Sequence, residues 1–327
     1  MTVDLDVVSQ SWPIEGTFSI SRGSRTEAVV VVVTLSEAGN DGQGECVPYA
    51  RYGESIDSVC DQILSIKDEI QAGVSRGELR RLMAPGAARN AIDCALWDME
   101  AKKAGSTAAA LAGLPPLHPV TTAYTLSVGT PEAMKEMATK SASRPLLKVK
   151  LAGDGDDERL KAVREGAPDS VLIIDANEAW SADNFEQNLN TAEKVGVALI
   201  EQPLPAGEDD LLRDIKTDCL ICADESLHSL DDLAPLYDRY QAVNIKLDKA
   251  GGLTEALDMA RQAKDLGYKI MTGCMVGTSL GMAPAMLVAQ FADFVDLDGP
   301  LLLAKDRAFG IQFNGSLMMP PQPALWG

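Results

Sequence analysis

The feature that most constrains the fold is an alternation of strand-like and helix-like segments between residues 121 and 300. Most intervals between the strand-like runs carry a helical pattern, as at 156–166, 183–195, 252–266 and 279–292, and such alternation predicts a parallel sheet. Eight runs, roughly 25 residues apart, favour a closed (β/α)8-type barrel, with a doubly wound open sheet as the alternative. The runs are TTAYTL, LLKVKL, VLIIDA, VALIEQP, CLICADE, AVNIKL, KIMTGC and FVDLDGP.

The first third of the chain is organised differently. Residues 15–47 predict a strand that ends in the valine-rich run 29–35, a turn rich in Gly, Asn and Asp, and a return strand toward Cys46. Segments 56–66 and 86–103 each gather apolar residues on one helical face. We therefore expect an α+β domain at 1–115, a barrel at 116–303, and a C-terminal segment at 304–327 that returns to the first domain.

Charge and cysteine content exclude several classes of protein. With 48 acidic and 29 basic residues, the net charge of -19 repels nucleic acids and anionic membranes. The longest apolar run, 28–35, is far shorter than the roughly 20 residues of a bilayer crossing. The acidic beginning lacks the pattern of a secretory signal, so we expect a cytoplasmic protein. The six cysteines have neither a disulfide framework nor zinc spacing, which predicts reduced thiols.

Six of the predicted strands carry charged residues, although their other residues are apolar enough to be buried. Burying a charge is costly unless a partner compensates it. In a barrel the C-terminal ends of the strands converge on one mouth, where the catalytic residues of such folds lie. We therefore expect these side chains to meet: Lys148, Lys150, Asp175, Glu201, Asp224, Lys246, Asp296 and Asp298.

Three of these residues form a candidate metal site. Asp175, Glu201 and Asp224 end three successive strands and supply oxygen ligands, with no Cys or His among them. Oxygen donors favour Mg2+ over zinc. Each aspartate alone could instead cap a helix, but three acids at one-unit spacing in one mouth favour the metal.

The lysines form a candidate pair of bases. Strand alternation places Lys148 and Lys150 on one face of their strand and the neighbouring apolar residues on the other. Because helices cover the outside of a barrel, the lysine face should point inward, although two surface charges are the alternative. Lys150 and Lys246 then flank the strands that carry the acids. Nearby cations, namely Lys148 and the metal, should lower the lysine pKa from about 10.4 toward the roughly 7 to 8 useful for proton abstraction.

Motifs along nearly the whole chain carry a resemblance to a known family. They are RGSRTEA, GECVPYARYGES, GAARNAIDCALWD, LLKVKL, IIDANEAW, LIEQPLPA, ICADES, VNIKLDKAGGLTEA, GCMVGTS and DLDGP. In this order the set resembles the enolase superfamily, specifically its dipeptide epimerases of the L-Ala-D/L-Glu type. The resemblance implies an α/β fold, a modified TIM barrel of the (β/α)7β kind with an α+β N-terminal capping domain.

The resemblance also implies a role for each matching residue. Asp175, Glu201 and Asp224 would bind Mg2+, Lys150 and Lys246 would be the two acid/base catalysts, and Lys148 would support them. Asp296 and Asp298 in DLDGP would receive the ammonium of a dipeptide. Arg25 in RGSR would meet the side-chain carboxylate of its glutamate, although a solvated surface arginine is the alternative.

The implied activity is Mg2+-dependent epimerisation of L-Ala-L-Glu to L-Ala-D-Glu or close analogues, by 1,1-proton transfer through an enediolate. The alternatives are an o-succinylbenzoate synthase or a muconate cycloisomerase, whose substrates lack an ammonium group, and a barrel that binds acidic dipeptides without turnover. The DLDGP pair argues against the two enzymes. The expected setting is murein peptide recycling, with a small-molecule dipeptide as the substrate, no nucleic acid or membrane partner, and a homo-oligomer left open.

Two short polar loops, 19–26 and 48–53, could close over the mouth, with Gly23 and Gly53 as hinges. Tyr49, Tyr52 and Arg51 are further candidates for substrate contact. Ala50 stands where many relatives carry proline, a departure that bears on loop stiffness. Candidates for a supporting shell around the site are Glu178, Trp180 and Lys249, whereas His118 and His228 are poor candidates for catalysis.

Overall fold

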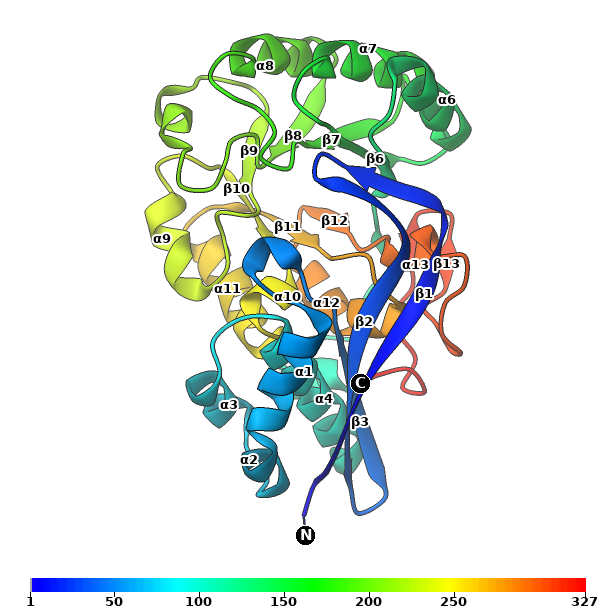
Figure 1. Ribbon diagram of the computed structural model, residues 1–327, viewed down its shortest axis with the longest axis vertical. Helices are drawn as coiled ribbons and strands as arrows, with labels where there is room; N and C mark the ends of the chain where they lie inside the picture. Colours follow the sequence, from blue (N-terminus) through cyan, green and yellow to red (C-terminus); the bar gives the residue numbers. More distant parts are fainter. Residues whose placement is uncertain (1) are drawn as a thin grey trace.

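The barrel predicted from the alternation is present in the computed structural model, which describes residues 2–327 (Figure 1). Eight parallel strands are hydrogen-bonded in chain order from β5 to β12. A parallel bridge between Thr122 and Val295 joins the two ends of the sheet, and Ala123 N donates to Val295 O at 2.8 Å. These contacts close the barrel. An open doubly wound sheet is therefore excluded. The strands are β5 (Tyr124–Leu126), β6 (Leu146–Lys150), β7 (Val171–Asp175), β8 (Val197–Glu201), β9 (Leu220–Ala223), β10 (Ala242–Ile245), β11 (Lys269–Gly273) and β12 (Phe294–Asp296).

Helices cover the outside of the barrel, but unevenly. The longer ones are α6 (Pro131–Ser141), α7 (Asp156–Gly166), α8 (Phe185–Lys194), α11 (Leu253–Asp265) and α12 (Ser279–Ala289). Between β8 and β9 the chain forms only the 3-10 helix η2 (Asp210–Asp214), and between β9 and β10 only η3 (Leu230–Asp232) and α9 (Leu233–Leu236). The short helices α10 (Leu247–Ala250) and α13 (Gly299–Leu302) follow β10 and β12.

Strand alternation divides the barrel interior into two layers. An apolar layer near the start of the strands contains Leu146, Ile173, Leu199, Cys222 and Met271. Two residues further along β6 to β9, the same inward positions carry charged side chains. The side-chain period of two along a strand therefore sets an apolar floor beneath a charged layer.

The N-terminal part forms an antiparallel sheet covered by helices. The strands β1 (Asp4–Ile20), β2 (Gly23–Glu37) and β3 (Asn40–Cys46) precede α1 (Ile56–Ser65), α2 (Lys67–Gln71), α3 (Arg76–Leu82), α4 (Ala87–Ala104) and α5 (Ala108–Leu111). The predicted hairpin and helices are confirmed, but β1 begins well before residue 15. Because β1 is the edge strand of its sheet, it keeps one exposed polar face and tolerates Pro13 beside a register shift.

Glycines let the sheet approach α4 closely. Gly42 and Gly44 lie on one face of β3 against the alanine-rich side of α4. A Cβ atom at Gly44 would overlap the backbone oxygen of Ala91 and lie 2.8 Å from the backbone nitrogen of Ala95. The contact between β3 and α4 thus depends on glycine at this position.

The C-terminal segment contacts both parts of the chain. Its strands β13 (Phe313–Asn314) and β14 (Leu317–Met318) form a small sheet with β4 (Val120–Thr121), while Arg307 forms a 2.7 Å ion pair with the buried Glu45 of β3. The domain limits at 115 and 303 stay a prediction. The six cysteines are free. No helix within 2–327 has both the length and the apolar character needed to cross a membrane.

Gly44→Ala should lower the free energy of unfolding by about 3 kcal/mol, because the new methyl group meets backbone atoms that cannot rotate away. Urea denaturation measures the change. Gly77→Ala is the control: Gly77 lies in α3 with open space around its Cβ position, so the variant should gain up to about 1 kcal/mol from helix propensity. Equal effects would contradict the close packing of β3 on α4.

Candidate active site

Three buried carboxylates meet at the C-terminal ends of β7, β8 and β9. Asp175, Glu201 and Asp224 each offer an oxygen within 4.8 Å of the others. Strand register brings them together, since Asp175 pairs with Lys150 on one side and Glu201 on the other. The structure therefore assembles the predicted metal ligands, here called the carboxylate triad.

The chemistry of the triad fits a hard divalent cation. Burial and the neighbouring Asp175 raise the pKa of Glu201 to about 7, which reflects the cost of crowding negative charge out of water. Among residues 2–327, no hydrogen bond of good geometry reaches Glu201 Oε2. Three convergent oxygen donors without Cys or His match the ligand preference of Mg2+.

Buried lysines surround the triad. Lys148 Nζ lies 2.6 Å from Glu201 Oε2, 3.2 Å from Asp175 Oδ2 and 2.7 Å from Asp296 Oδ2. Burial alone would lower the pKa of Lys148, but these three carboxylates outweigh burial and raise it. Lys249 donates to the side chain of Asp224 and, at 2.5 Å, to its backbone oxygen.

The two predicted bases lie at opposite ends of the triad. Lys150 Nζ lies 2.6 Å from Asp175 Oδ2, and Lys246 Nζ lies 2.6 Å from Asp224 Oδ2. The strands β7, β8 and β9 separate β6, which ends in Lys150, from β10, which precedes Lys246. The expected lowering of the lysine pKa depends on a bound metal ion and stays a prediction; the protein groups around Lys246 together act in the opposite direction. Burial would lower this pKa, but the adjacent Asp224 and Glu201 raise it.

A cavity of about 440 Å³ lies above this centre, and its wall includes Lys150, Lys246, Asp224 and Arg25. Tyr49 and Tyr52 also line it. Arg25 Cζ lies 5.6 Å from the ring centroid of Tyr49. Within residues 2–327 Arg25 makes no ion pair, whereas the other basic side chains of the wall are paired with carboxylates.

Asp296 and Asp298 are buried beside the cavity and do not form part of its wall. They neighbour Cys274, which does line the cavity: burial and then these two charges raise the pKa of its thiol. Asp298 Oδ2 accepts a 2.7 Å hydrogen bond from Thr125 N, and burial with the adjacent Asp296 raises the Asp298 pKa to about 7. Asp296 Oδ1 receives no hydrogen bond from the described residues.

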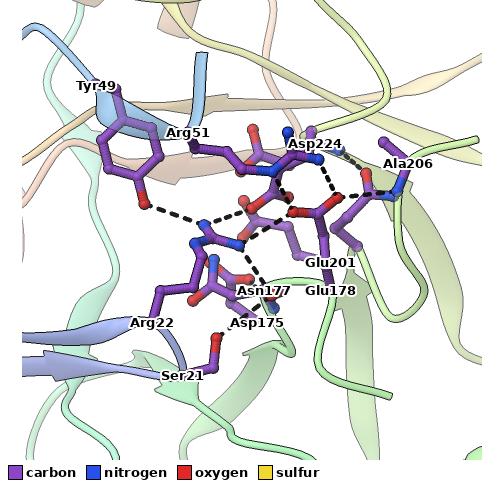
Figure 2. Close-up of polar contacts among 12 residues, drawn as sticks. Ser21, Arg22, Tyr49, Arg51, Asp175, Asn177, Glu178, Glu201, Ala206 and Asp224 are labelled. Carbon is purple, nitrogen blue, oxygen red and sulfur yellow. Dashed lines mark hydrogen bonds and ion pairs between the residues drawn. The ribbon is translucent and has the colours of Figure 1, made fainter. Parts of the chain in front are cut away.

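Two segments cover the cavity, the first lid segment (19–26) and the second lid segment (48–53). Figure 2 shows Arg22 of the first lid segment facing Glu178, with Arg51 and Tyr49 of the second lid segment beside it. Arg22 also forms a 2.7 Å ion pair with Glu225. The ring of Tyr52 packs edge-on against His228, with centroids 4.6 Å apart.

Sequence reasoning missed several residues that organise the site. Arg22 stands in the same RGSR motif as Arg25, and Glu225 directly follows Asp224. Gln202 directly follows Glu201, and its Oε1 accepts hydrogen bonds from Asp224 N at 2.9 Å and Ser226 N at 3.1 Å. Asn244 donates to Glu201 Oε1 at 2.7 Å. The available signal was proximity: three of them adjoin or share a motif with a predicted site residue, and Asn244 lies two positions before Lys246.

Comparison with family models covers most of the chain. Residues 132–300 match the enolase C-terminal domain-like family, and residues 2–113 match the N-terminal domain of mandelate racemase / muconate lactonizing enzyme. The chain belongs to the enolase superfamily. The modified (β/α)7β barrel with an α+β cap, expected from the resemblance, is thereby confirmed for this superfamily member.

Two curated members of the superfamily resemble this chain. It is 46% identical to the L-Ala-D/L-Glu epimerase of Escherichia coli K12, over 94% of this chain and 97% of that protein. It is 44% identical to an N-acetyl-D-glutamate racemase of a Pseudoalteromonas species, over 91% and 95%.

A solved structure is closer still. It is an enolase family member from Agrobacterium tumefaciens with homology to dipeptide epimerases, determined with bound sodium and L-Ala-L-Glu. This protein is 54% identical to the chain, the match covers 99% of this chain and 100% of that one, and the TM-score is 0.98.

Mg2+ at about 100 times its Kd should raise the free energy of unfolding by about 2.7 kcal/mol, since the ion binds only where the triad is assembled. Urea denaturation with and without Mg2+ measures this. Glu201→Gln should lose most of the increment, and Glu136→Gln, an exposed control on α6, should keep it. An unchanged Mg2+ increment in Glu201→Gln would place the ion elsewhere.

Proposed function

We propose that this enolase superfamily member is a Mg2+-dependent dipeptide epimerase, an isomerase that interconverts L-Ala-L-Glu with L-Ala-D-Glu or close analogues. The observation that carries the proposal is the position of Lys150 and Lys246 at opposite ends of the carboxylate triad. Similarity to an L-Ala-D/L-Glu epimerase over 94% of the chain supports the same reaction.

Epimerisation needs proton removal on one face of a carbon atom and proton return on the other. Lys150, the last residue of β6, and Lys246, which directly follows β10, both line the cavity and lie on either side of the triad. One lysine, as a neutral amine, takes the α-proton of the glutamate residue, and the other, as an ammonium, donates a proton to the opposite face. The reverse reaction exchanges the two roles. Lys148, which contacts carboxylates rather than the cavity, supports them electrostatically.

Asp175, Glu201 and Asp224 would hold the metal ion. When bound, Mg2+ would offset their charge and stabilise the negative charge that grows on the substrate carboxylate as the proton leaves. The lid segments exclude water from this centre, which strengthens the electrostatic interactions inside it.

Charges around the cavity suit the two ends of an Ala-Glu dipeptide. Arg25 is the cavity-wall cation without a carboxylate partner in residues 2–327, so it is free to bind the distal carboxylate. The carboxylates of Asp296 and Asp298 suit the ammonium of the dipeptide. Asp296 Oδ1 accepts no hydrogen bond from the described residues. Tyr49 and Tyr52 close the wall above the substrate. Murein peptide recycling in the cytoplasm, a homo-oligomer and the domain limits stay predictions.

Racemisation of N-acetyl-glutamate is the rival function, because one relative carries that activity by name. N-acetyl-glutamate has the same distal carboxylate, but a neutral acetyl group replaces the alanyl group that carries the ammonium of the dipeptide. A buried acid pair beside the cavity favours a cation over a neutral group. The dipeptide is therefore the preferred substrate.

The proton-transfer roles predict an isotope experiment. In D2O with Mg2+, the enzyme should place deuterium on the glutamate α-carbon of L-Ala-L-Glu faster than on the α-carbon of N-acetyl-L-glutamate, as read by mass spectrometry. Lys150→Ala and Lys246→Ala should each lower epimerisation by about 10³-fold or more, while one-sided exchange survives from a single epimer. Normal exchange in the double variant would refute the assignment of Lys150 and Lys246 as the bases. Faster exchange of N-acetyl-L-glutamate would favour N-acetyl-glutamate racemisation as the function.

Arg25→Met should raise KM for L-Ala-L-Glu by about 10- to 100-fold, because a hydrogen bond to a charged group contributes about 1.5–3 kcal/mol. L-Ala-L-Gln is the matched substrate, of the same shape without the distal charge, and its KM should change little. Steady-state kinetics with both dipeptides measure the difference. Equal changes for both would mean that another residue binds the distal carboxylate.

A further inference from the structure

The chain turns unusually just after the first triad residue. Asn177 and Glu178 both have positive φ values, 46° and 66°, although neither is glycine. Residues with a Cβ atom adopt this conformation rarely, and it persists where the surroundings fix it. Here Asn177 N donates to Asp175 Oδ1 at 2.9 Å, and Glu178 N donates to Gln202 O at 2.9 Å. The carboxylate of Glu178 is thus held at the rim of the barrel.

Four donor groups from three parts of the chain converge on this carboxylate. Arg51 of the second lid segment donates from Nε and Nη2, each at 2.8 Å. Arg22 of the first lid segment donates from Nη1 at 3.2 Å, and Ala206 N of the loop after β8 donates at 2.9 Å. Figure 2 shows both guanidinium groups facing Glu178. One carboxylate therefore joins both lid segments to the barrel.

Arg22 has further anchors on the barrel side. It pairs with Glu225 at 2.7 Å and donates to Asn177 O at 2.9 Å. It also donates to Tyr49 OH of the second lid segment at 3.0 Å. Arg25 follows three residues later, near the start of β2, and the Tyr49 ring lies 5.8 Å from the guanidinium carbon of Arg22 and 5.6 Å from that of Arg25. Fixing Arg22 therefore restricts where Arg25 can lie.

We propose that Glu178 is a positioning residue that locks the two lid segments together and, through Arg22, holds Arg25 at the substrate cavity. The inference rests on the proposed function, in which Arg25 binds the distal carboxylate. Glu178 itself does not line the cavity, so it acts through the two arginines.

An ordinary surface ion pair would not behave this way. Exposed pairs contribute little because water and salt screen them. The side chain of Glu178 is only 10% exposed, and it accepts a two-point hydrogen bond from Arg51. If Glu178 were purely structural, its substitution would lower stability without favouring one substrate over another. The two roles therefore predict different outcomes.

A double-mutant cycle tests the positioning role. Glu178→Gln should raise KM for L-Ala-L-Glu about tenfold, with a smaller effect on kcat and on L-Ala-L-Gln, as expected for a coupled positioning contact. In an Arg25→Met background the same change should raise KM by less than about twofold. Glu165→Gln, which removes an exposed ion pair on α7, is the control and should match the parent enzyme. Additive effects of the two substitutions would overturn the proposal.

Hydrogen–deuterium exchange tests the same contact without catalysis. Peptides spanning 19–26 and 48–53 should exchange faster in Glu178→Gln, while the barrel strands keep their protection. Arg51→Met should do the same and serves if Glu178→Gln fails to fold; Arg51→Lys, which keeps the charge but loses the two-point hydrogen bond, should restore only part of the protection. Unchanged lid exchange in Glu178→Gln or Arg51→Met would overturn the proposal. Faster lid exchange in an enzyme that epimerises no dipeptide would support the lock and refute the proposed function instead.

Discussion

The constraint on which the site depends is the cost of burying negative charge. Three buried carboxylates lie within 4.8 Å of one another, and such groups persist in the charged form only with cations beside them. The compensating cations are Lys148, Lys150, Lys246 and Lys249, and each contacts at least one member of the triad. Two of the lysines that compensate the triad, Lys150 and Lys246, are also the bases proposed for proton transfer.

Strand geometry delivers these groups to one place. The inward-facing positions of β6 to β9 carry apolar side chains first and charged ones two residues later. The floor is therefore apolar and buried, and the charged layer opens toward the lid segments. The α+β cap brings the lid to this opening, and its close packing through Gly44 fixes β3, which leads into the second lid segment, against α4.

The residues of the site that could be predicted are those whose positions follow from local sequence patterns. Strand alternation placed Lys148 and Lys150 inward, and the unit spacing of Asp175, Glu201 and Asp224 placed them in one mouth. Glu178 could be named as a supporting residue, but its contact with Arg22 could not be predicted, because the two residues are 156 positions apart and meet through a left-handed turn that no periodicity signals. The early start of β1 was hidden because an edge strand leaves one face polar. The pKa shifts of the lysines could not be predicted from the sequence either, since they depend on which carboxylates lie nearest in the fold.

The ammonium of Lys148 touches two members of the triad and also Asp296. A single cation is thus shared between the metal-binding end of the cavity and the end proposed for the dipeptide amine. If evolution exchanged Asp296 for a neutral residue to admit an uncharged substrate, Lys148 would lose a counter-charge and compete more strongly for Glu201 and Asp175. Divergence toward new substrates in this barrel is therefore coupled to metal retention, and a compensating change near Lys148 should accompany it.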